Sequence, residues 1–252
     1  MVLRIAMLLF AVCSLQGCVS ETPIDPRTLN LESPNGYTDF VPQTPQRSPL
    51  ITYYDGNGAE VTKSWTQLNN SQTMNILSNT RAEITVGKFD AQGNLTYLVA
   101  KAAAKVGTYR VVMDYCNYVT QNVTDATSTT TPKAILGQGR VGVGLRLTAD
   151  ILTTSADVNL GSLLALGIAA STGRVRGTMT VESIGIRVPG NAGPILSNTT
   201  IDESSIQKTL ESIAVIQSKI ADTSTVLDPQ VLAVKPLKPA AKPEQVMQKL
   251  TI

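Results

Sequence analysis

The sequence predicts an α+β fold: a mostly antiparallel β-sheet with two helices in the C-terminal half, at about residues 160–171 and 201–221. Polar and apolar residues alternate without a break over residues 140–151, which is the period of a strand with one buried face. Apolar residues recur at helical spacing over residues 206–220, directly behind a helix-capping sequence. Prolines crowd both ends of the chain, which predicts one folded domain flanked by Pro-rich tethers.

The proline positions set the expected boundaries. Six prolines fall between residues 19 and 50, and four fall between residues 229 and 243. Proline removes a backbone donor and favours an extended chain, so both segments are expected to be tethers. We therefore predict a tether over residues 18–50, a single α+β domain over residues 51–228, and a Pro/Lys-rich tail over residues 229–252.

The first half of this domain contains two turn signals between β-rich runs. Asp55–Gly58 separates the runs 51–54 and 59–62, which predicts a hairpin. Residues 81–89 form another β-rich run, and it ends at the turn sequence Asp90–Asn94.

Residues 95–106 allow two interpretations. Their apolar residues follow helical spacing, and Gly107 is placed as a C-cap, so a helix is expected. The β-rich run at 96–99 also allows a strand. The next run, over residues 108–120, is rich in Val and Tyr and predicts a strand.

The second half combines the strongest strand signal with the two helices. After the alternating segment 140–151, Asn159 is placed to cap the first helix, and Gly173 to end it. Alternation resumes over residues 175–181 and changes phase at 184–188, as a β-bulge would require.

The second helix begins at Thr200–Glu203, which matches a capping box. Two roles are open for its apolar stripe. It either covers the sheet, or forms a seam that joins copies of the protein. The residues of the stripe are Ile206, Leu210, Ile213 and Ile220.

The composition excludes several kinds of chemistry. The chain has no histidine, which removes His-dependent nucleophile pairs and imidazole metal sites. A net charge of +2 gives no reason to expect nucleic acid as a partner. Gly137–Gly142 matches a dinucleotide-binding pattern, but it opens a strand where that pattern needs a helix. We therefore predict no nucleotide, cofactor or metal site and no catalytic residue, and Cys116 is expected to be a buried thiol.

Carboxylates remain as the basis of an alternative function, a hydrolase acting on cell-wall glycans. Three acids lie in or near expected strands, although nothing in the sequence sets a pair of them at the separation that a glycosidase needs. The acids are Asp114, Asp150 and Glu182, and their expected ion-pair partners are Arg110, Arg146 and Arg187.

The start of the chain carries the clearest signal. Arg4 precedes an apolar run at residues 5–12, which is too short to cross a bilayer and is typical of a signal peptide. It is followed by a branched apolar residue, two residues of which the second is small, and a cysteine. These four residues are Leu15, Gln16, Gly17 and Cys18.

This segment resembles the lipobox of bacterial lipoprotein precursors. The resemblance covers residues 1–18 and implies that residues 1–17 are a signal peptide. It also implies that Cys18 becomes the first mature residue, held in a membrane by acyl chains such as palmitate. Two or three chains on one residue give durable anchoring. Position 19 is Val and not the Asp that retains such proteins at the inner membrane, so the outer membrane is expected.

These observations predict a lipid-anchored envelope protein with a non-catalytic structural or interaction role. Its expected partners are the membrane, other envelope proteins and, through the apolar stripe, a second copy of itself.

Overall fold

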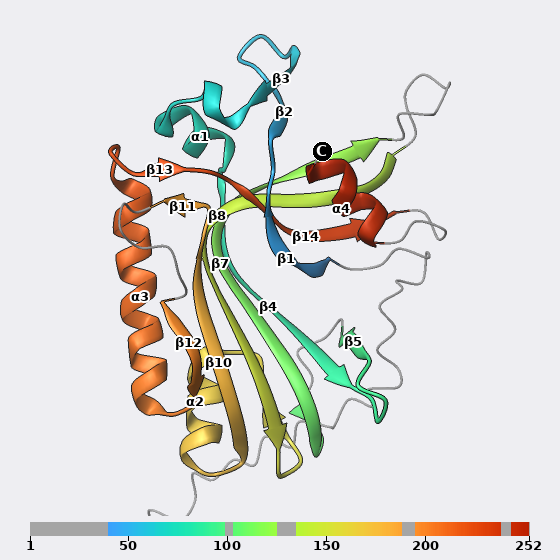
Figure 1. Ribbon diagram of the computed structural model, residues 1–252, viewed down its shortest axis with the longest axis vertical. Coiled ribbons are helices and arrows are strands. Elements are labelled where there is room, and N and C mark those ends of the chain that lie inside the picture. Colours follow the sequence, from blue (N-terminus) through green and yellow to red (C-terminus); the bar gives the residue numbers. More distant parts are fainter. Residues whose placement is uncertain (1–39, 99–102, 125–134, 188–194, 238–242, 252) are drawn as a thin grey trace, which may run out of the picture.

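A computed structural model describes residues 40–98, 103–124, 135–187, 195–237 and 243–251. Most of these residues form antiparallel strands, so the predicted α+β class with a mostly antiparallel sheet is confirmed (Figure 1). The helices are α1 (Asn70–Ile76), α2 (Leu163–Ser171), α3 (Glu203–Ala221) and α4 (Pro243–Thr251).

The main sheet has eight strands, six of them in the order β1-β14-β8-β7-β4-β5. The free half of the β8 edge pairs with β10, which in turn pairs with β12. The eight strands of the main sheet are β1 (Val41–Arg47), β4 (Asn79–Phe89), β5 (Leu95–Leu98), β7 (Gly107–Thr124), β8 (Ile135–Thr153), β10 (Val175–Ile184), β12 (Leu196–Thr200) and β14 (Gln230–Pro236). Three short two-stranded pairs surround it: β2 (Leu50–Tyr54) with β3 (Glu60–Ser64), β6 (Ala103–Ala104) with β9 (Val158–Asn159), and β11 (Ile186–Arg187) with β13 (Val226–Leu227).

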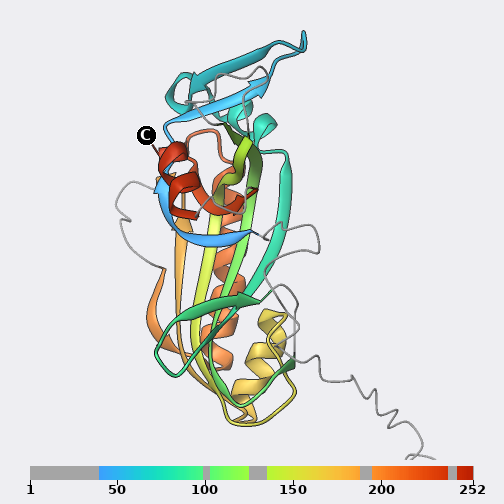
Figure 2. The same cartoon turned by 90° about the vertical axis from the view of Figure 1, so that its right-hand side faces the viewer.

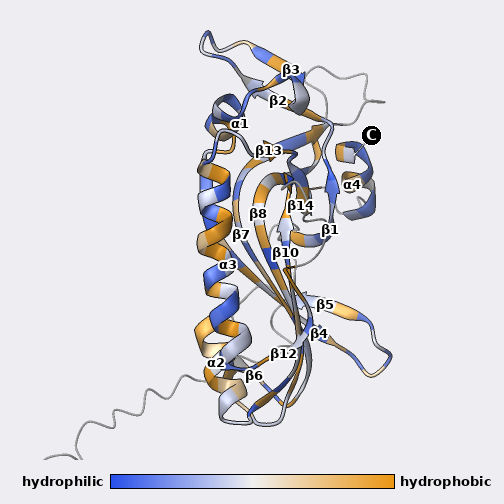
Figure 3. Cartoon of the chain, turned by 60° about the vertical axis from the view of Figure 1, so that its left-hand side comes forward, coloured by the Kyte–Doolittle hydropathy of each residue, from blue (hydrophilic) through white to orange (hydrophobic). Residues whose placement is uncertain are grey.

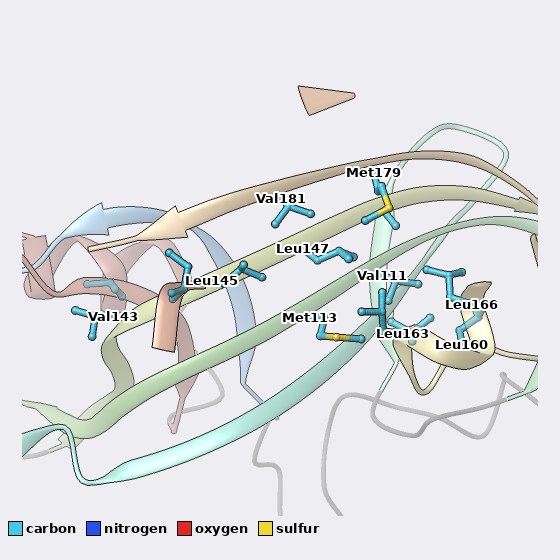
Figure 4. Packing of buried hydrophobic residues seen from close by; sticks show 14 of the residues in the cluster. Val111, Met113, Val143, Leu145, Leu147, Leu160, Leu163, Leu166, Met179 and Val181 are labelled. Atoms are coloured by element: carbon cyan, nitrogen blue, oxygen red, sulfur yellow. The ribbon is translucent and has the colours of Figure 1, made fainter. Parts of the chain in front are cut away.

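The alternation expected for residues 140–151 is present in β8, the central strand. Its odd-numbered residues from Val141 to Ile151 are buried in the main core. Figure 4 shows Val143, Leu145 and Leu147 in one layer with residues of β7, β10 and α2. Helices α2 and α3 contribute to this core, so they cover the face of the sheet on which it lies. The even-numbered positions of β8 point to the opposite face, which we call the polar face.

Two glycines on the polar face allow β7 and β8 to approach closely. A Cβ at Gly142 would lie 2.3 Å from the Asn117 carbonyl oxygen, and one at Gly144 would lie 2.3 Å from that of Tyr115. The earlier glycines of the same pattern accommodate α4. A Cβ at Gly137 would meet Val246, and one at Gly139 would meet Leu250. Packing therefore accounts for the glycines that resemble a nucleotide-binding motif.

Helices α2 and α3 lie close to the expected ranges but begin later. Ser162 caps α2, while the side chain of the expected cap, Asn159, accepts a hydrogen bond from the Gly161 backbone. Asp202 and Ser205 form the capping box of α3, two residues beyond the expected one. Figure 3 shows hydrophobic residues along both helices, interrupted by hydrophilic ones on α3.

The hairpin β2–β3 forms with its turn at Asp55–Gly58, as predicted, and projects from one end of the molecule beside α1 (Figure 2). The Asp55 carboxylate accepts hydrogen bonds from the backbones of Asn57 and Ala59, which fixes the turn. The second predicted turn also forms, because Asp90 accepts from Gln92 and Asn94 in the same way.

The predicted boundaries of the domain are wrong at both ends. Residues 41–47 form β1 and residues 230–236 form β14, and the two strands pair within the main sheet. Beyond them, residues 243–251 form α4, which packs against β14 and β8. The predicted tail at 229–252 is thus largely folded, and the predicted tether 18–50 is part of the domain from residue 40. Residues 18–39 and 238–242 lie outside the described residues.

The prediction of tethers was wrong because these prolines occupy positions at which a sheet tolerates proline. Pro42 and Pro45 lie in β1, an outer strand whose register is irregular between Pro42 and Gln46. Pro229 and Pro236 stand just before and at the end of β14. At outer strands and strand ends the missing N–H of proline costs no ladder hydrogen bond.

Two further predictions differ from the structure. The segment expected to be a helix at 95–106 contains β5 and β6, with residues 99–102 outside the described range. The phase change near residue 184 is not a bulge, because β10 pairs with β8 in continuous register through Ile184. Ile184 is instead buried on the polar face with Cys116 and Leu232, and it is the last residue of the strand, directly before Gly185, where φ is +63°.

Candidate functional site

The polar face of the sheet gathers charged residues into one row across four strands. Asp114 on β7 lies opposite Arg146 on β8, and Arg146 lies opposite Glu182 on β10. Glu83 on β4 extends the row beyond Asp114. Side chains that lie directly opposite each other on one face of a sheet interact. Arg146 therefore lies between two carboxylates that its charge attracts, those of Asp114 and Glu182.

Arg146 holds the centre of this row. It is 3% exposed, and its Nε and Nη2 atoms each lie 2.6 Å from one oxygen of Asp114. Nη2 also donates to the Leu232 carbonyl at 2.8 Å, and Nη1 donates to the Gln43 carbonyl of β1. Burial is the largest single influence and acts to lower the pKa of Arg146, but the hydrogen bonds to Asp114 and the nearby negative charges together outweigh burial and raise the pKa. A buried arginine bonded in this way is a fixed part of the structure.

Arg110 and Asp150 form a second two-point ion pair, four residues further along β8. The Nε and Nη2 atoms of Arg110 each lie 2.7 Å from one oxygen of Asp150. The bond to Asp150 raises the pKa of Arg110. This pair is more open than the first, since its side chains are 36% and 46% exposed. Between described residues, the Nη1 atom of Arg110 makes no hydrogen bond, so its N–H groups remain available to a ligand.

Tyr97 supplies an aromatic side chain beside Arg110. It lies opposite Gly87 in the β4–β5 pair, and a Cβ on Gly87 would lie 3.2 Å from the Tyr97 ring. The same Cβ would lie 2.6 Å from Leu95 Cδ1, so the absence of a side chain at Gly87 leaves space for both Leu95 and the Tyr97 ring. Burial raises the pKa of the Tyr97 phenol, and the nearby charge of Arg110 opposes that shift.

A pocket of about 300 Å³ lies between these groups and β1. Strand β1 pairs with β14 only near its two ends, at 41–42 and 46–47, and its irregular middle forms one wall. Arg146 holds this wall through the Gln43 carbonyl. The polar lining consists of Gln43, Thr44, Arg110, Arg146, Thr148 and Glu182.

Glu182 differs from the other acids on this face. Asp114 and Asp150 are each engaged by an arginine, whereas the Glu182 carboxylate has no hydrogen bond or ion pair with any described residue. Its half-buried side chain lines the pocket. The pocket therefore offers an available acceptor at Glu182 and available donors at Arg110.

The structure places the three acids and two of their three expected arginine partners on one face. Arg187, the third, pairs instead with Asp228, which also binds Arg47. The spacing of charges could have revealed the face in advance. Arg110 and Asp114 are four residues apart, as are Arg146 and Asp150, so antiparallel pairing brings opposite charges together.

The remaining candidate residues lie elsewhere. Leu15, Gln16, Gly17 and Cys18 lie outside the described residues. Cys116 is buried, and burial raises the pKa of its thiol well above the ordinary range. In the α3 stripe, Ile206 and Ile220 are buried in the core and Ile213 is half-buried against it, while Leu210 is 52% exposed. Most of the stripe therefore covers the sheet.

Over the residues that the structure covers, no three His, Cys, Asp or Glu side chains are grouped as a metal site would require. Among the same residues, no helix has the length and hydrophobicity needed to span a bilayer.

Comparisons with protein families, with curated protein sequences and with solved structures give no match.

Proposed function

We propose that this chain is a lipid-anchored protein of a bacterial envelope that binds its partner through the polar face without catalysing a reaction. The pocket under β1 carries the binding part of this proposal. The lipobox resemblance at Leu15–Cys18 supports the anchor. If Cys18 is acylated, the anchor and the pocket wall at Pro42 are separated by about 80 Å of chain when it is fully extended, at ~3.3 Å per residue.

The ion pairs support a binding role over a hydrolytic one. A glycosidase needs two carboxyl groups that face the substrate, one of which gives or takes a proton. Asp114 and Asp150 are each bound at both oxygens by an arginine, so neither is free for proton transfer. Glu182 alone is unengaged, and a single carboxylate does not provide the pair. The hydrolase alternative therefore has less support than binding.

The anchor is tested by metabolic labelling with palmitate in a bacterium with two membranes. We expect Cys18→Ala to lose the label and to accumulate as an unprocessed precursor. Cys13→Ala is the matched control, since it changes a cysteine of the same segment and should be labelled and sorted to the outer membrane. Labelling of the Cys18→Ala chain would rule out the proposed anchor.

The binding role is tested by site-specific photo-crosslinking in intact cells. A photoreactive residue in place of Thr44, in the pocket wall, should give a discrete cross-linked product. The same residue in place of Gln92, in an exposed turn, is the control and should not. Equal product patterns at both positions would count against a partner bound at the polar face.

Self-association is a further part of the proposal and concerns the exposed side of the helices. Leu210 and Val215 of α3 are 52% and 57% exposed, and Leu164 and Ile168 of α2 are 68% and 58% exposed. Light scattering measures this directly. If these residues join copies, the protein is larger than a monomer and Leu210→Lys lowers its mass. A monomer at every concentration would remove self-association from the proposal.

A further inference from the structure

The pocket under β1 presents available groups of opposite charge at two separate places. Arg110 keeps N–H groups that no described residue accepts, and Glu182 keeps both carboxylate oxygens. The other charged groups of the face are engaged. Arg146 is bound to Asp114 and to two backbone carbonyls, and Asp150 is bound to Arg110. A ligand would therefore meet donors at one place and acceptors at the other.

The register of the sheet sets the separation of these two groups. Arg110 lies opposite Asp150, and Glu182 lies opposite Arg146, on the two sides of β8. Asp150 and Arg146 are four residues apart, which is roughly 13 Å along a strand, and β7 and β10 lie two strand spacings apart, which is roughly 10 Å. The side chains of Arg110 and Glu182 start from these separate backbone positions, and both line one pocket of about 300 Å³. Two groups that reach the pocket from separate strands suit a molecule with two distinct charged ends.

The signs of the two groups select the ligand chemistry. A guanidinium binds a carboxylate most strongly, and a carboxylate binds an ammonium most strongly, because both bonds are charge-assisted. Tyr97 and the rings of Pro42 and Pro45 line the same pocket and give apolar contact for the part between the charged ends. A neutral sugar would form only hydrogen bonds without charge assistance at Arg110 and Glu182, which are weaker.

We propose that this pocket binds a small zwitterionic ligand, a short peptide with its free carboxylate at Arg110 and its free ammonium at Glu182. The proposal rests on the binding role proposed above and is independent of the lipid anchor. Because β1 forms one wall, a bound ligand also holds β1 against the sheet.

The test measures binding of alanyl-alanine to the purified full chain by calorimetry. Its N-acetyl form lacks the ammonium, and its C-terminal amide lacks the carboxylate. We expect alanyl-alanine to bind at least about tenfold more tightly than either blocked form, because each block removes one charge-assisted hydrogen bond. Glucose serves as the neutral, hydroxyl-rich probe and should not bind.

Two variants assign the ends of the ligand. Glu182→Gln should weaken alanyl-alanine binding at least about tenfold and leave the weak binding of the N-acetyl form unchanged. Arg110→Gln is paired with Asp150→Asn so that no carboxylate is left without a partner. This double variant should also weaken alanyl-alanine binding at least about tenfold, and it should leave the weak binding of the C-terminal amide unchanged. Glu211→Gln and Arg176→Gln change exposed charges outside the pocket and should bind like the parent chain. Circular dichroism checks that each variant is folded.

Three outcomes would overturn the ligand class: no binding of alanyl-alanine at millimolar concentration, equal binding of the blocked and free forms, or binding of glucose in preference to the dipeptide. None of them bears on the anchor, which the Cys18 variant tests, or on the cross-link at Thr44. Failure of the ligand class is therefore distinguishable from failure of the proposed function.

Discussion

Arg146 is a buried charge whose stability depends on its partners. Asp114 and two backbone carbonyls satisfy most of its N–H groups, and the Asp114 side chain is itself only 15% exposed. Breaking a buried pair from one side leaves the other charge without compensation. Replacing one member of the Arg146–Asp114 pair should therefore destabilise the protein more than replacing both.

We expect Arg146→Met to lower the free energy of unfolding by roughly 3–5 kcal/mol, since Asp114 would remain buried without a counter-charge. The double variant Arg146→Met/Asp114→Leu should recover most of that loss. Urea unfolding of both variants measures the difference. Equal losses in the single and the double variant would show that the pair is not the cause.

Cys116 makes the free energy of unfolding depend on pH in the alkaline range. Burial raises the pKa of the folded thiol, whereas an unfolded thiol ionises near its ordinary value of about 8.5. Above that pH the unfolded state binds fewer protons than the folded state, so the free energy of unfolding falls as pH rises. The contribution of Cys116 is fully present below about pH 8.5 and decreases above it.

Comparison with Cys116→Ala isolates this contribution, because all other titrating groups are shared. Between pH 7 and pH 10 the parent chain should lose more stability than the variant, by up to about 1.4 kcal/mol for each unit above 8.5. Urea unfolding under reducing conditions at both pH values provides the measurement. Parallel losses would mean that the pKa of the Cys116 thiol is not raised in the folded state.

At the scale of the elements, the central strand pair depends on close approach. A Cβ on Gly142 would lie 2.3 Å from a backbone oxygen of β7, which cannot rotate away as a side chain can. Gly56, in the tip of the β2–β3 hairpin, has no atom within 4 Å of such a Cβ. The two glycines therefore form a matched pair.

We expect Gly142→Ala to destabilise the protein by about 1–3 kcal/mol through strain in the β7–β8 pair. Gly56→Ala should change stability by no more than about 0.5 kcal/mol, as most exposed substitutions do. Thermal unfolding of both variants tests this. A neutral Gly142→Ala would show that β7 and β8 adjust to the methyl group.

Sequence periodicity predicted those elements that have one apolar, buried face and one polar face. The alternation of β8 and the stripe of α3 are such cases, because a core on one side fixes their spacing. Strand β14 lacks this signal, since Val231, Leu232, Ala233 and Val234 are all buried. Leu232 lies in the smaller cluster on the polar face and Val231 in the main core, so the strand reads as a plain apolar run. The prediction of a helix over residues 95–106 was wrong because apolar residues at helical spacing in a short run are also compatible with two strands.

The candidate site was beyond prediction from the sequence in one respect. The acids and arginines were identified, and the opposite charges at matching intervals on β7 and β8 were visible. Their meeting depends on the pairing of β10 with β8 and on the position of β1, which closes the pocket from the other end of the chain. No local pattern contains that information, since it belongs to the topology.

At the scale of the whole molecule, the C-terminal residues complete the domain. Val246, Met247 and Leu250 of α4 are buried in the main core. A chain that ends after Lys242 should therefore lose several kcal/mol of unfolding free energy, at roughly 1.5–3 kcal/mol for each buried apolar side chain removed. Gln248→Ala, which changes an exposed residue of the same helix, is the control and should have little effect.

Urea unfolding and resistance to limited proteolysis measure this loss. A dispensable tail, as the prolines suggested, would give unchanged stability when residues 243–252 are removed. That outcome would contradict the packing of α4 on β14 and β8.

The pairing of β1 with β14 also governs when the protein can finish folding. Strand β1, at residues 41–47, is synthesised long before its partner at residues 230–236. Contacts between such distant segments form slowly, because a long loop must close first. Strand β1 thus has no partner strand until residues 230–236 have been synthesised, and an unpaired strand promotes aggregation. If the chain is exported before it folds, as the proposed lipid anchor implies, the two strands meet for the first time on the far side of the membrane and this hazard is avoided.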